Sequence, residues 1–383
     1  MINHSSKLAA AYPTKPLSEC LQSVNVPAKI PKKAFLDTGK FPIVSQESDF
    51  INGYWNDEAD AIQVDKPIVV FGDHTQVLKL IDFDFVVGAD GVKLLKPKEF
   101  LDAAFLRYFL EANPVPSLGY ARHYRHISGM PVPLMLLEEQ KRIVAVLDQA
   151  FAALDRARAL AEANLADAGD LFKVKLDATF RSAGKNKIRV DELFRVGSSK
   201  RVLKSEWKDS GVPFYRGREV TRLALDGKVA NELFISEGHY AELAAKTGVP
   251  EPGDIVITAI GTIGNAYVVG KDDRFYFKDA SVLWMHRTSE ISSDFVKFWI
   301  RSASFHDQLE RGNGATVDTL TIGKLQGLLM PELSAKEQER VVEELTAFEK
   351  GIGCLSSSYE RKLADLATLR QSLLQKAFAG ELT

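Results

Sequence analysis

The chain has 383 residues, which is long for one compact hydrophobic core, so two domains are expected. With 45% hydrophobic and 26% charged residues, and no run of about 18 apolar residues, the composition excludes a disordered chain and a membrane protein. The formal net charge of −2 leaves a nucleic-acid partner open, because local clusters of cations decide phosphate binding.

Residues 1–133 are predicted to form a mixed α+β domain. Runs of β-branched and aromatic residues at 68–71 and 83–87 predict strands, bounded by Gly, Pro and Asp. The segment GYARHYRH (119–126) interleaves cations with aromatic rings, which suits phosphates and bases, although half of these residues could instead anchor the domain to the next helix. The candidate nucleic-acid contacts of this domain are Lys32, Lys33, Ser45, Gln46, His74, Gln76, Tyr120, Arg122, His123, Tyr124 and Arg125.

Residues 134–182 are predicted to form a long central helix. Apolar residues step by four and three along it, and a narrow seam of this kind is typical of a coiled coil. Some forty residues at 1.5 Å each would give a rod of roughly 60 Å, which suits a spacer. The residues expected to contact a partner helix are Ile143, Leu147 and Leu154.

Residues 183–331 are predicted to form a second α+β domain, with strands at 255–257 and 266–269. Residues 185–222 contain eleven Lys or Arg against five Asp or Glu, which favours phosphate binding; a solvated charged face is the alternative. The AIGTIGN loop (259–265) has two glycines that would allow DNA to approach the backbone closely, unless it is a plain tight turn. The candidate contacts here are Lys200, Arg201, Arg216, Arg218, Arg222, Thr262, Asn265, Asn313 and Thr316.

Residues 332–383 are predicted to form a second long helix with the same kind of seam. Gly351 and Gly353 weaken its early turns, so a bend or fraying is expected there. The residues expected to contact the partner helix are Leu345, Phe348, Leu355 and Leu366.

The two halves of the chain repeat one another. Glu139 and Gln140 match Glu337 and Gln338 at an offset of 198 residues, and the match stays ungapped to Phe180 and Phe378. Two further pairs correspond more loosely, FPIVSQ with VPFYRG and FLRYFLEAN with FVKFWIRSA. The repeat predicts the order domain, long helix, domain, long helix, with a pseudo-twofold relation between the halves.

This layout resembles the specificity subunits of type I restriction-modification systems. The most specific parts are PVPLMLLEEQKRIVAVLD (131–148), residues 333–345 and the tail LRQSLLQKAFAGEL (369–382). Leu134 and Met135 stand where the family commonly has a second proline.

The resemblance implies that each variable domain is a target-recognition domain contacting one half of a bipartite site in double-stranded DNA. It also implies that the two helices lie antiparallel and bind two copies of a methyltransferase subunit. Restriction/motor subunits are further implied partners, and the chain is expected to direct adenine methylation or restriction by these partner subunits.

The motifs of catalysis are missing. No GxxxxGK[ST] phosphate loop and no Asn or Asp followed by Pro-Pro and an aromatic residue occur, so we expect a non-catalytic cytoplasmic protein. With two cysteines and no metal-ligand spacing, we expect no metal and no cofactor, and His123 and His126 are interpreted as surface or DNA-facing residues. The specificity subunit of a related type II system and a coiled-coil adaptor that never binds DNA remain as alternatives.

Overall fold

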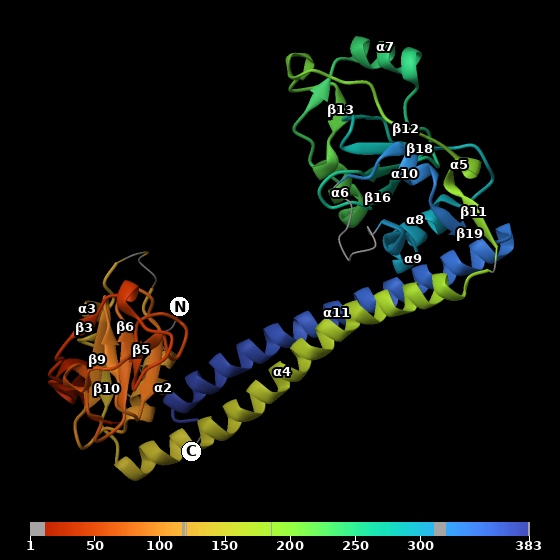
Figure 1. Cartoon of the computed structure of the whole chain (residues 1–383). Helices are drawn as coiled ribbons and strands as arrows, with labels where there is room; N and C mark the ends of the chain where they lie inside the picture. The colour runs from red at the N-terminus through yellow and green to blue at the C-terminus, as the bar shows by residue number, and fades with distance from the viewer. Residues whose placement is uncertain (1–11, 117–118, 120, 185, 310–318, 382–383) are drawn as a thin grey trace. The chain divides into compact units, whose positions relative to one another are not determined.

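The computed structural model describes residues 12–116, 119, 121–184, 186–309 and 319–381. The chain divides into two compact units, which we call unit 1 (Met1–Glu162 with Glu360–Thr383) and unit 2 (Ala163–Tyr359). Each unit contains one mixed domain and parts of both long helices, α4 (Leu137–Ser182) and α11 (Ala335–Phe378), labelled in Figure 1. Along the chain, the strands β1 to β10 precede α4, and the strands β11 to β19 precede α11.

Unit 1 is built on antiparallel and mixed sheets, with strand orders β2-β9-β6-β7 and β3-β8-β4-β5, and a β1-β10 ribbon. Its central strand β6 reads IVVFG and is buried throughout, as expected for a continuous apolar run. The strands are β1 (Thr14–Pro16), β2 (Leu21–Gln22), β3 (Lys29–Ile30), β4 (Phe41–Val44), β5 (Gly53–Trp55), β6 (Ile68–Gly72), β7 (Leu78–Ile81), β8 (Val86–Gly88), β9 (Val92–Pro97) and β10 (Pro131–Pro133). The helices of its domain are η1 (Leu17–Cys20), η2 (Lys32–Ala34), η3 (Glu58–Asp60), α2 (Ala103–Ala112) and α3 (Tyr124–Ile127).

Unit 2 has strand orders β12-β18-β15-β16 and β14-β13-β17, and a β11-β19 ribbon. Its strands are β11 (Lys187–Arg189), β12 (Phe194–Gly197), β13 (Val212–Tyr215), β14 (Phe234–Ile235), β15 (Ile255–Thr258), β16 (Ala266–Val268), β17 (Tyr276–Phe277), β18 (Val282–Arg287) and β19 (Leu329–Pro331). The helices of its domain are α5 (Val190–Leu193), η4 (Lys204–Glu206), α6 (Gly217–Asp226), α7 (Glu237–Thr247), α8 (Ser293–Arg301), α9 (Ala303–His306), η5 (Asp307–Leu309) and α10 (Ile322–Gln326). In this unit α8 and α9 lie between the sheet and the long helices (Figure 1).

The two domains share one topology. The order β2-β9-β6-β7 in unit 1 matches β12-β18-β15-β16 in unit 2 strand for strand. In both units a parallel pair, β4 with β8 and β13 with β17, is extended by an antiparallel strand, β5 or β14. The sequence repeat therefore reflects a duplicated fold.

The ends of the long helices belong to the domain cores. In unit 1, Leu147 near the start of α4 and Phe378 at the end of α11 share one core cluster with Phe105 of α2, whose ring centre is 5.2 Å from that of Phe378. In unit 2 the residues 198 positions away repeat the arrangement, and Phe180 lies 5.3 Å from Phe295 of α8. Burying each such side chain stabilises the fold by about 1.5–3 kcal/mol.

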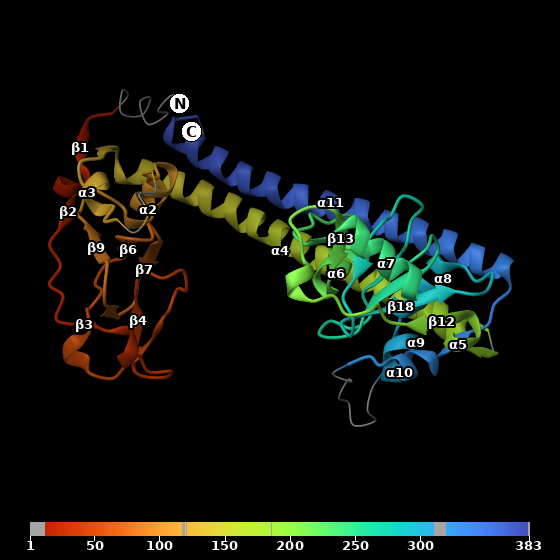
Figure 2. The same cartoon turned by 90° about the horizontal axis from the view of Figure 1, so that it is seen from above.

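Within each unit the two long helices run antiparallel. In unit 2, Lys175 forms an ion pair with Glu344 and the ring of Phe172 stacks on that of Phe348, so later residues of α4 meet earlier residues of α11. Figure 2 shows the two helices side by side in this unit. Of the residues expected to contact the partner helix, Phe348 takes part in this contact.

Buried glutamines fasten each long helix to its domain. Gln140 Oε1 accepts from the N–H of Asp102, the N-cap of α2 (2.8 Å), and its amide donates to the carbonyls of Phe100 and Met135 (2.9 Å each). Gln338 Oε1 accepts from the N–H of Ser292, the N-cap of α8 (2.9 Å). The glutamine of the repeated Glu-Gln motif therefore attaches the long helix to the domain in both units.

Two expectations for α11 are wrong. The fraying expected at Gly351 and Gly353 does not occur, because each glycine costs only about 1 kcal/mol relative to alanine and the start of the helix is anchored in the unit 2 core. Leu355 is 40% exposed, because the partly buried positions step from Ile352 to Ser356 and place it off the seam.

Candidate nucleic-acid interface

In unit 2, four loops converge where β13 and β15 end. β13 runs parallel to β17, so Tyr215 and Phe277 are neighbours at the same end of both strands. Ser199 Oγ donates to the carbonyl of Phe277 (2.7 Å), and the N–H of Ala259 donates to the carbonyl of Ser281 (2.9 Å), which ties the adjacent loops together. We call this surface the unit 2 loop cluster, and it comprises residues 198–201, 215–222, 259–265 and 278–281.

Helix α6 forms the first wall of this cluster. It begins after Arg216, whose backbone N–H donates to Glu219 Oε2 (2.9 Å), and ends at Gly227, whose φ of 68° suits glycine. Val220 and Leu223 are buried, and Val220 belongs to the cluster of apolar residues on the sheet. The helix therefore turns its polar face away from the core.

That polar face carries arginines held by carboxylates. Glu219, only 3% exposed, accepts from Arg216 Nη2 (2.9 Å) and Arg218 Nε (2.8 Å), and Arg218 Nη2 also donates to Glu232 (2.7 Å). Burial alone would raise the pKa of Glu219, but the hydrogen bonds from Arg216 and Arg218 outweigh it and lower the pKa to about 2. Arg222 is exposed one turn further along.

The glycine loop lies beside α6. Thr258 Oγ1 donates to the carbonyl of Thr262 (2.5 Å) and accepts from the N–H of Asn265 (3.1 Å), which closes the loop into a turn with Gly261 at φ 77°. Asn265 Nδ2 donates to Thr221 Oγ1 of α6 (3.1 Å). The structure therefore brings Thr262, which is exposed, and Asn265 next to the arginine helix.

Two further loops complete the unit 2 loop cluster. Lys200 and Arg201 are exposed, and the N–H of Lys200 donates to the hydroxyl of Tyr276 (2.8 Å). Lys278 is also exposed and its N–H donates to the carbonyl of Tyr215 (2.7 Å), yet sequence reasoning missed it. A single cation between Phe277 and Asp279 gives no signal until strand pairing is known.

Unit 1 carries a second cluster at the equivalent strand ends. Gln46, just after β4, accepts through Oε1 from the N–H of His74 (3.2 Å), and Thr75 Oγ1 donates to the carbonyl of Gln46 (2.6 Å). His74 Nδ1 lies 3.2 Å from the carbonyl of Ala121. We call this surface the unit 1 loop cluster, and it comprises residues 45–47, 73–75, 89–91 and 121–125.

Cations surround the unit 1 loop cluster more sparsely. Arg122 and Arg125 are exposed, and Lys93 Nζ, which sequence reasoning missed, lies 5.3 Å from the centre of the Tyr124 ring. Lys32 on η2 is bound to Glu47 of the cluster (2.7 Å), and Lys33 beside it is exposed.

Burial corrects two of the predicted contacts. Ser45 is 4% exposed and its Oγ accepts from the N–H of Glu47 (3.2 Å). His123 is 1% exposed and its Nδ1 lies 2.9 Å from the carbonyl of Asp73. Both side chains support the loops from within, so we remove them from the candidate DNA contacts.

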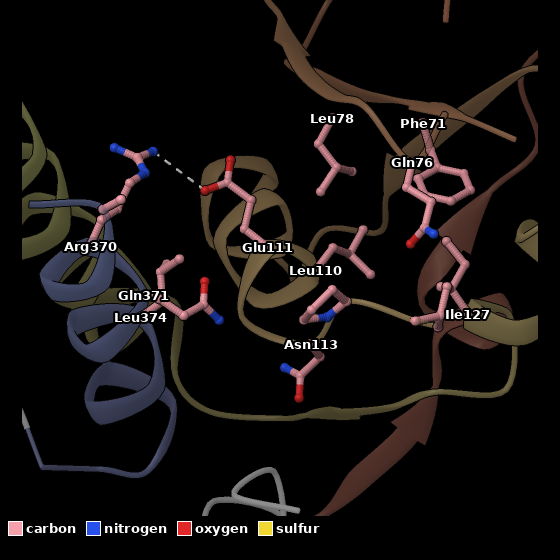
Figure 3. Close-up of a pocket in the computed structure, with 13 residues that line it drawn as sticks. Phe71, Gln76, Leu78, Leu110, Glu111, Asn113, Ile127, Arg370, Gln371 and Leu374 are labelled. Carbon is pink, nitrogen blue, oxygen red and sulfur yellow. Dashed lines mark ion pairs between the residues drawn. The ribbon is translucent and has the colours of Figure 1, made fainter. Parts of the chain in front are cut away.

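Gln76 also lies away from the cluster. It lines a cavity of unit 1 with Leu78 and Ile127, and Figure 3 shows it across this cavity from Arg370 of α11, which pairs with Glu111 (3.6 Å). Gln76 therefore packs within the domain of unit 1, and we remove it from the candidate DNA contacts. The candidates Tyr120, Asn313 and Thr316 lie outside the described residues.

Ligands of other kinds find little support in the part of the chain that the structure describes. Its His, Cys, Asp and Glu side chains form no group of three or more that could hold a metal ion. None of the described helices has the length and apolar character needed to cross a membrane. Cys20 is buried and Cys354 exposed, and both are free thiols.

No family model matches the chain, but curated relatives do. A putative type I restriction enzyme specificity subunit of Haemophilus influenzae is 24% identical over 354 residues, covering 88% of this chain and 87% of that protein. The EcoBI specificity subunit of Escherichia coli is 23% identical over 313 residues, covering 75% of this chain and 66% of its own length. Over most of its length the chain is similar to type I restriction enzyme specificity subunits.

Solved structures agree with the specificity-subunit fold. A chain from a structural study of type I restriction-modification complex assembly superimposes with a TM-score of 0.72 at 18% identity, over 97% of this chain and 98% of that one. The HsdS subunit of Thermoanaerobacter tengcongensis gives 0.61 at 18% identity, over 97% of each chain. The predicted fold class, two mixed domains with two long helices, is thereby confirmed.

Proposed function

We propose that the chain recognises a bipartite sequence in double-stranded DNA and directs adenine methylation or restriction by partner subunits. In this proposal unit 1 reads one half of the site and unit 2 reads the other. The chain supplies specificity and carries no catalytic group, since the phosphate loop and the methyltransferase motif do not occur in its sequence.

One observation carries the proposal. The same fold occurs twice, and each copy gathers loops at equivalent strand ends, yet the side chains on the two loop clusters differ. A duplicated scaffold with different surfaces suits the reading of two unlike short sequences. Arginine pairs well with guanine edges and amide side chains with adenine, so the two surfaces favour different bases.

The partners follow from the proposed role. The relatives are named as subunits of type I restriction enzymes, which supports methyltransferase and restriction/motor subunits as partners. The 198-residue repeat gives α4 and α11 similar sequences, so two copies of one methyltransferase could bind equivalently.

The long helices would set the number of unread base pairs between the half-sites. Deleting the equivalent heptads 158–164 and 356–362 removes about 10 Å of helix, or roughly three base pairs at 3.4 Å each. We expect each half-site to stay unchanged while the spacer shortens; an unchanged spacer would refute a ruler role.

The decisive experiment is footprinting of the complex of this chain with its methyltransferase subunits. We expect protection of two short segments separated by unread base pairs, and an affinity that falls steeply as salt rises. Equal protection of a scrambled duplex of the same length would overturn the proposal. An absence of all DNA binding by the complex would favour the adaptor alternative.

A further inference from the structure

Glu219 occupies an unusual position for a carboxylate on a DNA-reading helix. It lies on the side of α6 that faces the domain and is 3% exposed, whereas Arg216 and Arg218 beside it are 29% and 51% exposed. A buried carboxylate is strongly unfavourable unless it is paired and hydrogen-bonded. Its retention therefore requires partners, and the partners are the two arginines.

The hydrogen bonds fix both guanidinium groups. Arg216 approaches through Nε (3.2 Å) and Nη2 (2.9 Å), one to each carboxylate oxygen, which is the planar two-point geometry that arginine favours. Arg218 approaches through Nε (2.8 Å), and Glu232 holds its Nη2 (2.7 Å). Among the described residues, the Nη1 atom of neither arginine takes part in a hydrogen bond, so each keeps a free donor edge.

We propose that Glu219 is a positioning residue that presents Arg216 and Arg218 to the DNA half-site of unit 2. This inference rests on the proposed function and adds a specificity determinant to it. Arginine side chains are flexible, and holding them before DNA binds reduces the ordering that binding would otherwise require. The carboxylate thus contributes to recognition although it repels the phosphates.

That repulsion makes the proposal testable. If Glu219 acts by positioning, loss of its charge lowers the affinity for the specific site; if it acts only by repulsion, loss of its charge raises the affinity for DNA. Removing a negative charge near DNA strengthens sequence-independent binding to phosphates. Removing a positioning group weakens the contacts of Arg216 and Arg218 with their own bases. A structural role alone would instead weaken both kinds of binding together.

The test uses Glu219→Gln in the full chain, assembled with its methyltransferase subunits. Binding is measured against a duplex carrying the site mapped by footprinting and against a scrambled duplex of equal length. We expect the affinity for the mapped site to fall about 5- to 150-fold, the range for one lost bidentate base contact, while scrambled binding stays equal or tightens. Equal weakening of both duplexes, or undiminished specific binding, would overturn the inference.

Two controls separate the possible failures. The wild-type complex must prefer the mapped duplex over the scrambled one; if it does not, the proposed function fails and not only the role of Glu219. Base changes in the half-site of unit 1 must cost the Glu219→Gln complex the same affinity as the wild-type complex, which shows that the variant assembles and that unit 1 still reads its half-site.

Glu232→Gln provides an independent test should the first variant unfold the start of α6. Glu232 is exposed and forms an ion pair with Arg218, so the domain does not depend on it for burial. We expect a smaller loss of specific affinity, about 2- to 5-fold, with scrambled binding equal or tighter. A rise in affinity for both duplexes would show that Glu232 acts only by repulsion and would contradict the positioning account.

Discussion

The segments that follow the equivalent strands β4 in unit 1 and β13 in unit 2 have different structures. After β4 the chain forms the loop 45–52, and after β13 it forms helix α6. Behind the loop lies buried Lys79 of β7, whose Nζ donates to the carbonyls of Ser45 and Asp49 and to Asn52 Oδ1. Helix α6 itself contains the buried Glu219.

The comparison shows how one scaffold can present two chemistries. A buried ammonium supports a segment rich in acceptors, and a buried carboxylate supports a segment rich in arginine donors. Burial lowers the pKa of Lys79, although Asp49 and Glu47 oppose the shift. In each unit the buried side chain thus has the charge that suits the hydrogen-bonding groups of the segment that follows the strand. The shared fold accommodates either charge.

The largest expected effect is a loss of stability at acid pH when Glu219 becomes protonated. The pKa of Glu219 is about 2 in the fold against an ordinary 4.5, so its contribution to stability is complete above pH 4.5 and is lost as the pH falls towards 2. The full contribution is about 3 kcal/mol, and about 2 kcal/mol of it should disappear between pH 5 and pH 3. Urea unfolding at these two pH values measures it. Glu219→Gln should lack this loss; an identical pH dependence in both proteins would refute the assignment.

Gln140 in unit 1 and Gln338 in unit 2 should contribute equally to the free energy of unfolding. Gln140→Ala and Gln338→Ala each leave buried backbone groups unpaired, so each should lower the free energy of unfolding by about 2 kcal/mol. Chemical denaturation of both variants tests this, with exposed Glu138→Ala as a control expected to have little effect. Strongly unequal losses would show that the duplicated motif no longer has one role.

The sequence predicted those structural features that depend on residues close together in the chain. The long helices and the repeat followed from an offset of 198 residues, and β6 and β15 followed from short apolar runs. Ser45 and Arg216 correspond in sequence, but Ser45 is buried because Lys79 and Asn52 close over it from elsewhere in the chain. Contacts of that kind cannot be inferred from neighbouring residues.

The same limit applies to the loop clusters. Arg216 and Arg218 were predictable from a local excess of cations, whereas Lys278 joins them only through the pairing of β13 with β17. Leu355 was misplaced because a four-residue step to Ser356 shifts the seam by one position. Packing between distant elements, rather than composition, decides these cases.

Lys79→Met should disturb only the unit 1 half-site. The methionine retains much of the length but donates no hydrogen bond, so the loop 45–52 loosens and recognition weakens by about 1 kcal/mol. Binding to duplexes with base changes in either half measures the effect. Lys66→Met, which removes an exposed ion pair with Glu99, should leave binding unchanged, and an equal loss in both halves would contradict the comparison.

The smallest effect should come from the exposed arginines that lack a buried anchor. Arg222→Ala in unit 2 and Arg125→Ala in unit 1 each should remove about one phosphate contact, lowering the slope of log affinity against log salt by about 0.9. A titration over several salt concentrations measures the slope. A change in base preference, with the slope intact, would instead assign these residues to base reading.

The most direct test of two independent reading surfaces is to sequence the methylated motif made by the assembled complex. Wild type, Gln46→Ala and Arg218→Ala would be compared in the same cells. We predict a split motif in wild type, loss of base preference in one half for Gln46→Ala, and in the other half for Arg218→Ala. Relaxation of the same half by both variants, or a continuous motif in wild type, would contradict the account.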